Sequence, residues 1–98
     1  MSEIIDRVTR MENILDELAA VVAKSAQAMD ELENHVEKLN TIKKYYESQY
    51  MKDWSADERG ELPKDLKRGV LSEDGINTVL IDFFELSTKM KELAKKIR

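Results

Sequence analysis

The feature that most constrains this chain is a run of apolar residues spaced alternately four and three positions apart, from Ile4 to Leu39. Because an α-helix turns once in about 3.6 residues, this spacing keeps all of them on one side of a helix. The stripe therefore predicts a helix whose apolar side faces another helix. Its members, of which only Ser25 is polar, are Ile4, Val8, Met11, Leu15, Leu18, Val22, Ser25, Met29, Leu32, Val36 and Leu39.

Residues 2–52 are rich in strong helix formers, and neither glycine nor proline occurs before Gly60. We therefore predict one long helix over residues 2–52. A second set of residues lies one position before the first stripe and widens the apolar face, which suits a helix with two neighbours in a bundle. These residues are Ile14, Val21, Ala28, His35 and Ile42.

A second apolar stripe near the end of the chain has no polar member and predicts a shorter helix over residues 73–98. Ser72 is the predicted N-cap, with Glu73 and Asp74 in the first turn. Lysine and arginine fill the last turns, where the helix dipole favours positive charge. The stripe consists of Ile76, Val79, Phe83, Leu86, Met90, Leu93 and Ile97.

The segment between the two predicted helices is a long connection with turn signals. Ser55 and Glu58 have capping-box spacing and predict a short helical turn that stops at Gly60, and Pro63 predicts another that stops at Gly69. Four apolar residues predict that the loop is partly ordered: Leu62, Leu66, Val70 and Leu71. We expect them to cover the aromatic residues Tyr45, Tyr46, Tyr50 and Trp54.

These elements predict an all-α fold in which the last helix returns antiparallel to the end of the long first helix. Because it is only half as long, it leaves the start of the first helix uncovered. A large apolar side chain contributes about 1.5–3 kcal/mol when it is fully buried. We therefore expect a homodimer that completes the helical bundle. The expected interface is Ile4, Val8, Met11, Leu15, Leu18 and Val22.

A monomeric three-helix bundle is the alternative, in which the first helix breaks near residues 25–30. Asp30 and Glu33 have the spacing of a capping box that could start a new helix there. The apolar spacing nevertheless continues unbroken through Val22, Ser25 and Met29, which favours a continuous helix and the dimer. The orientation of the two subunits stays open.

The run from Glu61 to Asp74, together with Tyr45-Tyr46 and Trp54, resembles a bacterial family of about this size that is catalogued as a domain of unknown function, DUF4298. Its most specific part is the sequence Leu-Pro-Lys-Asp-Leu-Lys-Arg-Gly-Val-Leu-Ser-Glu-Asp. The resemblance covers most of the chain. It implies a bacterial origin and a helical fold, and it brings no activity or ligand with it.

The residue types present do not indicate a catalytic, cofactor or metal site. The chain has no cysteine and one histidine, and it lacks a nucleophile triad and a glycine-rich phosphate loop. We therefore predict no catalytic residue, no cofactor and no metal site, and an enzyme is the least favoured class. We expect instead a protein-protein interaction or scaffold module that binds an unidentified protein. Its candidate partner-binding residues are Trp54, Lys64, Asp65, Lys67 and Arg68.

Charge and hydropathy narrow the class of partner and the location. The net charge is −4, and acidic and basic residues are interspersed, so no broad basic face is predicted for nucleic acid. A nucleic-acid-associated accessory protein is the alternative function, suggested by the basic residues near the C-terminus. No stretch approaches the roughly 20 apolar residues that a membrane span needs. With no signal peptide apparent, we expect a cytoplasmic protein without a membrane partner.

Overall fold

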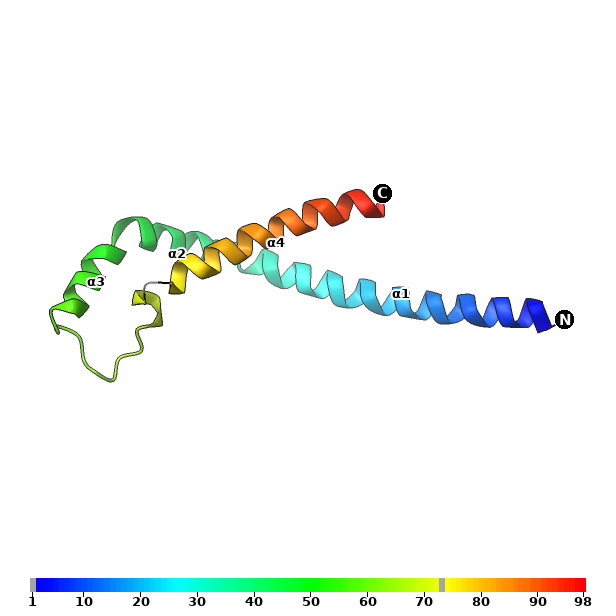
Figure 1. Cartoon of the computed structure of the whole chain (residues 1–98), viewed down its shortest axis with the longest axis horizontal. Coiled ribbons are helices and arrows are strands. Elements are labelled where there is room, and N and C mark those ends of the chain that lie inside the picture. The colour runs from blue at the N-terminus through cyan, green and yellow to red at the C-terminus, as the bar shows by residue number, and fades with distance from the viewer. Residues whose placement is uncertain (1, 73) are drawn as a thin grey trace. The chain divides into compact units, whose positions relative to one another are not determined.

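The computed structural model describes residues 2–72 and 74–98, and within them all regular secondary structure is helical. The predicted all-α class is confirmed. The chain order is α1 (Ser2–Asn34), α2 (Val36–Ser48), α3 (Tyr50–Glu58), the short 3-10 helix η1 (Gly69–Leu71) and α4 (Gly75–Ile97), and Figure 1 labels the α-helices. The chain divides into an N-terminal unit, residues 1–37, and a C-terminal unit, residues 38–98.

The N-terminal unit is dominated by α1, a 33-residue helix with no interruption between Ser2 and Asn34. The break near residues 25–30 that the three-helix alternative requires is therefore absent. At about 1.5 Å per residue the helix is roughly 50 Å long. The unbroken apolar spacing predicted this continuity, and the acid pair Asp30 and Glu33 does not start a new helix.

The long helix predicted over residues 2–52 is interrupted at His35, which the sequence did not indicate. The backbone N–H of His35 donates to the carbonyl oxygen of Leu32 at 3.0 Å, three residues back instead of four. Its ring Nδ1 lies 2.7 Å from the carbonyl oxygen of Glu31, the usual acceptor for that backbone N–H. Because a carbonyl oxygen only accepts, Nδ1 must carry the proton. The side chain thus replaces a helical hydrogen bond, and α1 ends.

Helical structure also continues further than predicted, because α3 reaches Glu58. Ser55 lies inside α3, so the predicted separate helical turn beginning at Ser55 is wrong. Only Gln49 separates α2 from α3, and its N–H still donates to the carbonyl oxygen of Tyr45 at 3.0 Å. The interruption at Gln49 is consequently slight.

The end of α3 is set by Gly60, the predicted stop. Gly60 has a φ of 75°, a left-handed conformation that glycine adopts without a steric penalty. Its N–H donates to the carbonyl oxygen of Asp57 at 2.9 Å, and the N–H of Glu61 donates to that of Ala56 at 3.1 Å. These two bonds form a Schellman motif, which satisfies carbonyl groups at the helix end.

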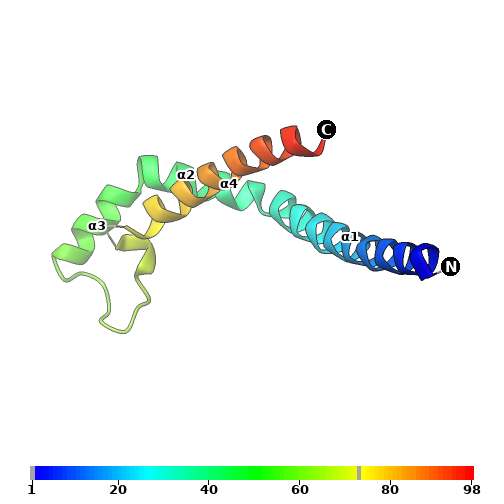
Figure 2. The same cartoon turned by 45° about the vertical axis from the view of Figure 1, so that its right-hand side comes forward.

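After an irregular segment, α4 begins at Gly75 and ends at Ile97, within the predicted range of residues 73–98. Asp74 occupies the N-cap position but makes no side-chain cap hydrogen bond, whereas the predicted cap, Ser72, accepts from the N–H of Gly75 at 3.1 Å. Glu73, predicted for the first turn, lies outside the described residues. Within the C-terminal unit, α4 runs in the direction opposite to α2 (Figures 1 and 2), as the antiparallel fold predicts.

A small core holds the C-terminal unit together. Tyr50, Leu71 and Ile76 are its buried members, with 8%, 7% and 2% of their surfaces exposed. They come from α3, η1 and α4, so the core joins the three elements. Partly buried residues surround it: Ile42, Tyr45, Tyr46, Leu62 and Leu80. No helix in residues 2–72 and 74–98 is both long and apolar enough to cross a membrane.

Candidate interaction surfaces

The first candidate surface is the apolar stripe of α1. No residue of α1 is buried, and except for Leu32, which is partly buried, its large apolar side chains are between 42% and 65% exposed. All six residues of the predicted dimer interface are in this state: Ile4, Val8, Met11, Leu15, Leu18 and Val22. An exposed apolar stripe along a regular helix is unusual on a protein surface, which makes it a candidate interaction surface.

The second candidate surface belongs to the C-terminal unit, where the core positions an ordered loop between α3 and α4. The ring of Tyr50 packs 5.0 Å from that of Tyr46 and 6.4 Å from that of Tyr45, the latter edge to face. Its hydroxyl lies 3.4 Å from the carbonyl oxygens of both Leu71 and Ser72. Tyr50 therefore connects the helical part of the unit to the far end of the loop.

Arg68 fixes the middle of this loop. Its Nη1 donates to Oδ1 of Asp57 at 2.7 Å, its Nε donates to the carbonyl oxygen of Leu66 at 3.3 Å, and its Nη2 donates to the carbonyl oxygen of Pro63. The Asp57 side chain is only 18% exposed, so this ion pair is partly shielded from water. The guanidinium is thus engaged within the chain, and Arg68 positions the loop that carries the other candidate residues.

The loop ends in a close backbone approach that sequence analysis missed. A side-chain carbon on Gly75 would lie 2.4 Å from the carbonyl oxygen of Gly69 and 2.7 Å from Oγ of Ser72. Ser72 itself donates to the Gly69 carbonyl oxygen at 2.7 Å while it accepts from the Gly75 N–H. Only glycine fits at position 75. The Gly–x–x–Ser–x–x–Gly spacing is visible in the sequence, but spacing alone does not predict that these three residues lie close together.

Lys64, Asp65 and Lys67 are exposed on this loop. Lys64 and Asp65 form a turn closed by the N–H of Leu66, which donates to the carbonyl oxygen of Pro63 at 3.2 Å. The predicted helical turn from Pro63 to Gly69 is limited to this single turn, and Gly69 begins η1 instead of ending a turn. The two ammonium groups and one carboxylate face solvent on a backbone that Arg68 holds.

The sequence suggested that Trp54 is covered together with the tyrosines. In the structure it does not join the core and remains 37% exposed on α3. It lines an open groove with Tyr46, Tyr50 and Met51. The expected aromatic cluster therefore consists of the three tyrosines, and the indole stays available at the surface. A second, mostly apolar groove is lined by Lys38, Thr41, Ile42, Tyr45 and Val70.

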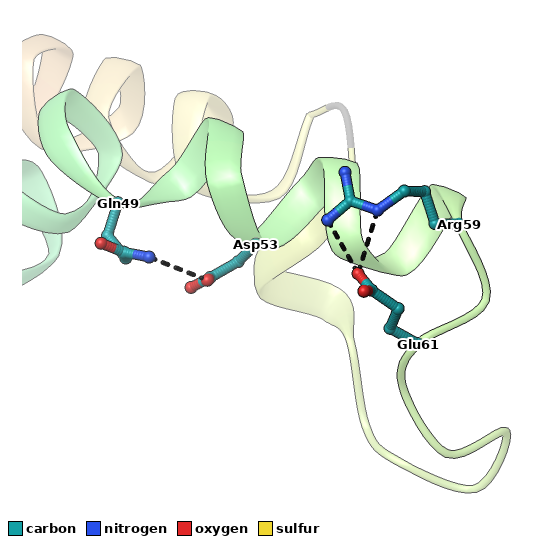
Figure 3. A network of polar contacts seen from close by, with 4 residues as sticks. All are labelled: Gln49, Asp53, Arg59 and Glu61. Atoms are coloured by element: carbon teal, nitrogen blue, oxygen red, sulfur yellow. Dashed lines mark hydrogen bonds and ion pairs between the residues drawn. The ribbon is translucent and has the colours of Figure 1, made fainter.

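A short polar network reinforces the start of α3. The Tyr45 hydroxyl donates to Oδ2 of Asp53 at 2.8 Å, and Nε2 of Gln49 donates to Oδ1 of the same carboxylate at 3.2 Å. Figure 3 shows the Gln49 contact and, at the end of α3, the ion pair between Arg59 and Glu61 at 2.8 Å. Burial, and then the hydrogen bond to Asp53, raises the pKa of Tyr45 to about 12. The same hydrogen bond lowers the pKa of Asp53.

Carboxylate side chains occur on the C-terminal unit, but they lie apart or are engaged in hydrogen bonds. Among residues 2–72 and 74–98, no three or more histidine, aspartate or glutamate side chains gather where they would hold a metal ion. Polar groups gather at two places. Asp53 accepts a hydrogen bond from Tyr45, and Arg68 donates one to Asp57.

The comparison with protein families extends over nearly the whole chain. No curated protein and no solved structure is significantly similar to it. The family model described as Domain of unknown function (DUF4298) matches residues 8–93, a range that includes most of α1, the whole loop and most of α4. The resemblance noted from the loop sequence is thereby confirmed, and the chain belongs to the DUF4298 family.

Proposed function

We propose that this protein is a non-enzymatic interaction module with two surfaces. Through α1 it associates with a second copy of the chain, and through the loop of the C-terminal unit it binds another protein. The observation that carries the proposal is the state of α1, a 33-residue helix with a regular apolar stripe and no buried residue. A helix of this kind gains its stability from tertiary or quaternary packing far more than from intrinsic propensity.

The second copy is favoured as the occupant of α1 because the stripe has the period of a self-associating coiled coil. Burying one large apolar side chain contributes about 1.5–3 kcal/mol, and the stripe offers six of them before Ser25. The same surface is present on every copy, so two chains satisfy each other in a symmetric dimer.

The second proposed surface, called the loop surface, consists of the exposed Trp54 on α3 and of Lys64, Asp65 and Lys67 on the loop that follows α3. Trp54 and Met51 supply an exposed apolar groove, and Lys64 and Lys67 supply positive charge on the loop that follows α3. Tryptophan is enriched at sites where proteins bind each other. We infer that this surface takes a segment that presents an apolar side chain next to acidic ones. Arg68 supports the surface from within through its pairing with Asp57.

The self-association is tested with one charge placed on the stripe and one placed away from it. Leu15→Glu puts a carboxylate among apolar residues, whereas Ala20→Glu, in the same helix, lies off the stripe. Light scattering should give twice the chain mass for the wild type and for Ala20→Glu, and one chain mass for Leu15→Glu. A single chain mass for all three proteins, or an unchanged dimer in Leu15→Glu, would contradict the proposal.

The loop surface is tested by capture of the cellular partner with the full chain. The double variant Lys64→Ala with Lys67→Ala should lose a protein that the wild type retains. The matched control, Lys89→Ala with Lys91→Ala, removes the same charge from α4 and should retain it. Equal capture by both double variants would remove the loop lysines from the proposed site. Arg68 is left intact, because its loss would disturb the loop itself.

A further inference from the structure

We propose that the two α1 helices pair parallel and in register, so that both C-terminal units leave the same end of the coiled coil. This inference rests on the proposed self-association and adds the orientation of the two chains. It comes from the residues that flank the apolar stripe of α1, whose continuous helix fixes where each of them lies.

The alternating spacing assigns every residue of α1 to a heptad position. Val8, Leu15, Val22 and Met29 take position a, and Ile4, Met11, Leu18, Ser25 and Leu32 take position d. Position g, before each a, holds Arg7, Ile14, Val21 and Ala28. Position e, after each d, holds Ile5, Glu12, Ala19, Ala26 and Glu33. The g side thus carries a base and no acid, and the e side carries acids and no base.

This separation of charge argues against an antiparallel pair in any register. When two helices run antiparallel, g positions face g positions and e positions face e positions. Arg7 then meets only apolar residues or another Arg7, and Glu12 meets only Glu12, Glu33 or apolar residues. No attractive flanking pair forms at any offset, and several offsets bring like charges together.

A parallel, in-register pair instead places each g residue opposite the e residue five positions later on its partner. Arg7 then faces Glu12 of the other copy, and both side chains are exposed in the single chain. The next two pairs join a large apolar residue to a small one, Ile14 with Ala19 and Val21 with Ala26. The two Ser25 residues share one layer, so the single polar position of the stripe faces its own copy.

The orientation has a consequence for the proposed partner. In a parallel pair both chains continue from His35 at one end of the coiled coil. In an antiparallel pair they continue from opposite ends, about 50 Å apart for a helix of 33 residues. The parallel dimer therefore displays two copies of the loop surface from one end. Two linked surfaces bind a partner with two matching segments more tightly than one surface does.

Cysteine cross-linking of the full chain tests the orientation, because the sequence contains no cysteine. Met11→Cys and Ser25→Cys each place one thiol at position d, two heptads apart, and Gln27→Cys places one at the outer position f. Each variant is oxidised separately, and its mass is measured under reducing conditions by light scattering. Ile4→Cys, also at position d, replaces Met11→Cys if that variant no longer dimerises.

The inference expects both d-position variants to convert almost completely to covalent dimers, with Gln27→Cys remaining uncross-linked. In an antiparallel dimer only the residue at the two-fold axis meets its own copy. If Met11 lay there, the two Ser25 residues would be about 40 Å apart. Cross-linking at only one d position, or at none, in a protein of dimer mass overturns the orientation alone. A single chain mass under reducing conditions overturns the self-association as well.

Discussion

The two units of this chain obtain their order in different ways. In α1 a simple pattern repeats for 33 residues and buries nothing within the chain. In the C-terminal unit, three buried residues from three different elements and a few specific hydrogen bonds define a loop. A repeated apolar pattern defines a surface, but it does not determine which molecule binds to that surface. A set of unrepeated contacts specifies a particular backbone, and each contact depends on one residue.

Removing the core of the C-terminal unit should have the largest effect on stability. Tyr50→Ala should destabilise that unit by about 3–5 kcal/mol, because it empties the centre of a small core. The adjacent, exposed Met51→Ala should have little effect. Hydrogen exchange read residue by residue should show lost protection around Leu71 and Ile76 with α1 unchanged. Equal loss of protection in α1 would show that the two units are not independent.

Gly75→Ala tests whether a single close approach defines the loop end. The new carbon would meet the Gly69 carbonyl oxygen at 2.4 Å, so we expect a loss of about 1–3 kcal/mol in the free energy of unfolding. Gly69→Ala is the matched control, because nothing lies within 4 Å of a side-chain carbon there. Chemical denaturation of both variants measures the difference. Equal stability of the two would show that the turn is not as described.

Arg68→Lys tests the contact that fixes the middle of the loop. Lysine keeps the charge but loses the planar fork that reaches Asp57 and two carbonyl oxygens. The expected loss is about 1 kcal/mol, below the usual range for hydrogen bonds to charged groups because the pair is partly exposed. Lys67→Arg serves as control and should be neutral in thermal unfolding. If Arg68→Lys did not change the stability, Arg68 would not fix the loop and would again be a candidate partner-binding residue.

Exchanging the charges of Arg7 and Glu12 tests the proposed contact between them in the dimer. Arg7→Glu and Glu12→Arg should each weaken a parallel dimer, and the double variant should recover about 0.2–1 kcal/mol, the range for exposed ion pairs. Arg10→Glu is the control for Arg7→Glu, because both variants lose the same kind of contact within the helix. Arg7 follows Glu3 by four residues, and Arg10 follows Asp6 by four residues. Dimer dissociation constants of the four proteins give the coupling. Strictly additive effects would contradict the contact between Arg7 and Glu12.

The smallest expected effect concerns the hydrogen bond between Tyr45 and Asp53. The pKa of Tyr45 is raised from 10.0 to about 12, so its stabilising contribution is complete below pH 10 and lost as the pH rises towards 12. The pKa of Asp53 is lowered, so its contribution is present above pH 3.8 and lost as the pH falls through the folded-state pKa. In an alkaline absorbance titration, the phenol that ionises at about pH 12 should disappear in Tyr45→Phe.

Asp53→Asn separates the two causes of the raised Tyr45 pKa. Burial is the larger cause and remains in this variant, whereas the carboxylate is gone. The Tyr45 pKa should therefore fall only part of the way towards 10. A complete return to 10 would show that the carboxylate, and not burial, controls this phenol.

The sequence predicted what depends on regular spacing and missed what depends on contacts between distant residues. The continuity of α1 and the stop at Gly60 follow from local rules. The end of α1 at His35 does not, because Leu32, Val36 and Leu39 keep the apolar spacing through it. The role of Arg68 was also hidden, since its acid partner, Asp57, lies eleven residues away across a loop.

Two further errors had the same origin. Ser55 and Glu58 satisfied the spacing of a helix start, yet Ser55 continues a helix that already exists. Trp54 was expected among the aromatic residues that the loop covers, but it is 37% exposed, whereas Tyr50, one turn earlier, is 8% exposed. Residues four positions apart lie on the same side of a helix, so the spacing did not distinguish Tyr50 from Trp54. The core with Leu71 and Ile76 covers Tyr50, and the sequence alone did not indicate how far along α3 this cover would extend.

We propose that a second copy of the chain covers the apolar stripe of α1. Sedimentation equilibrium of the unmodified protein at micromolar concentration tests it most directly. We predict a mass of twice 11.4 kDa that persists on dilution until the dissociation constant is reached. A stable, fully helical protein of 11.4 kDa at every concentration would contradict the account.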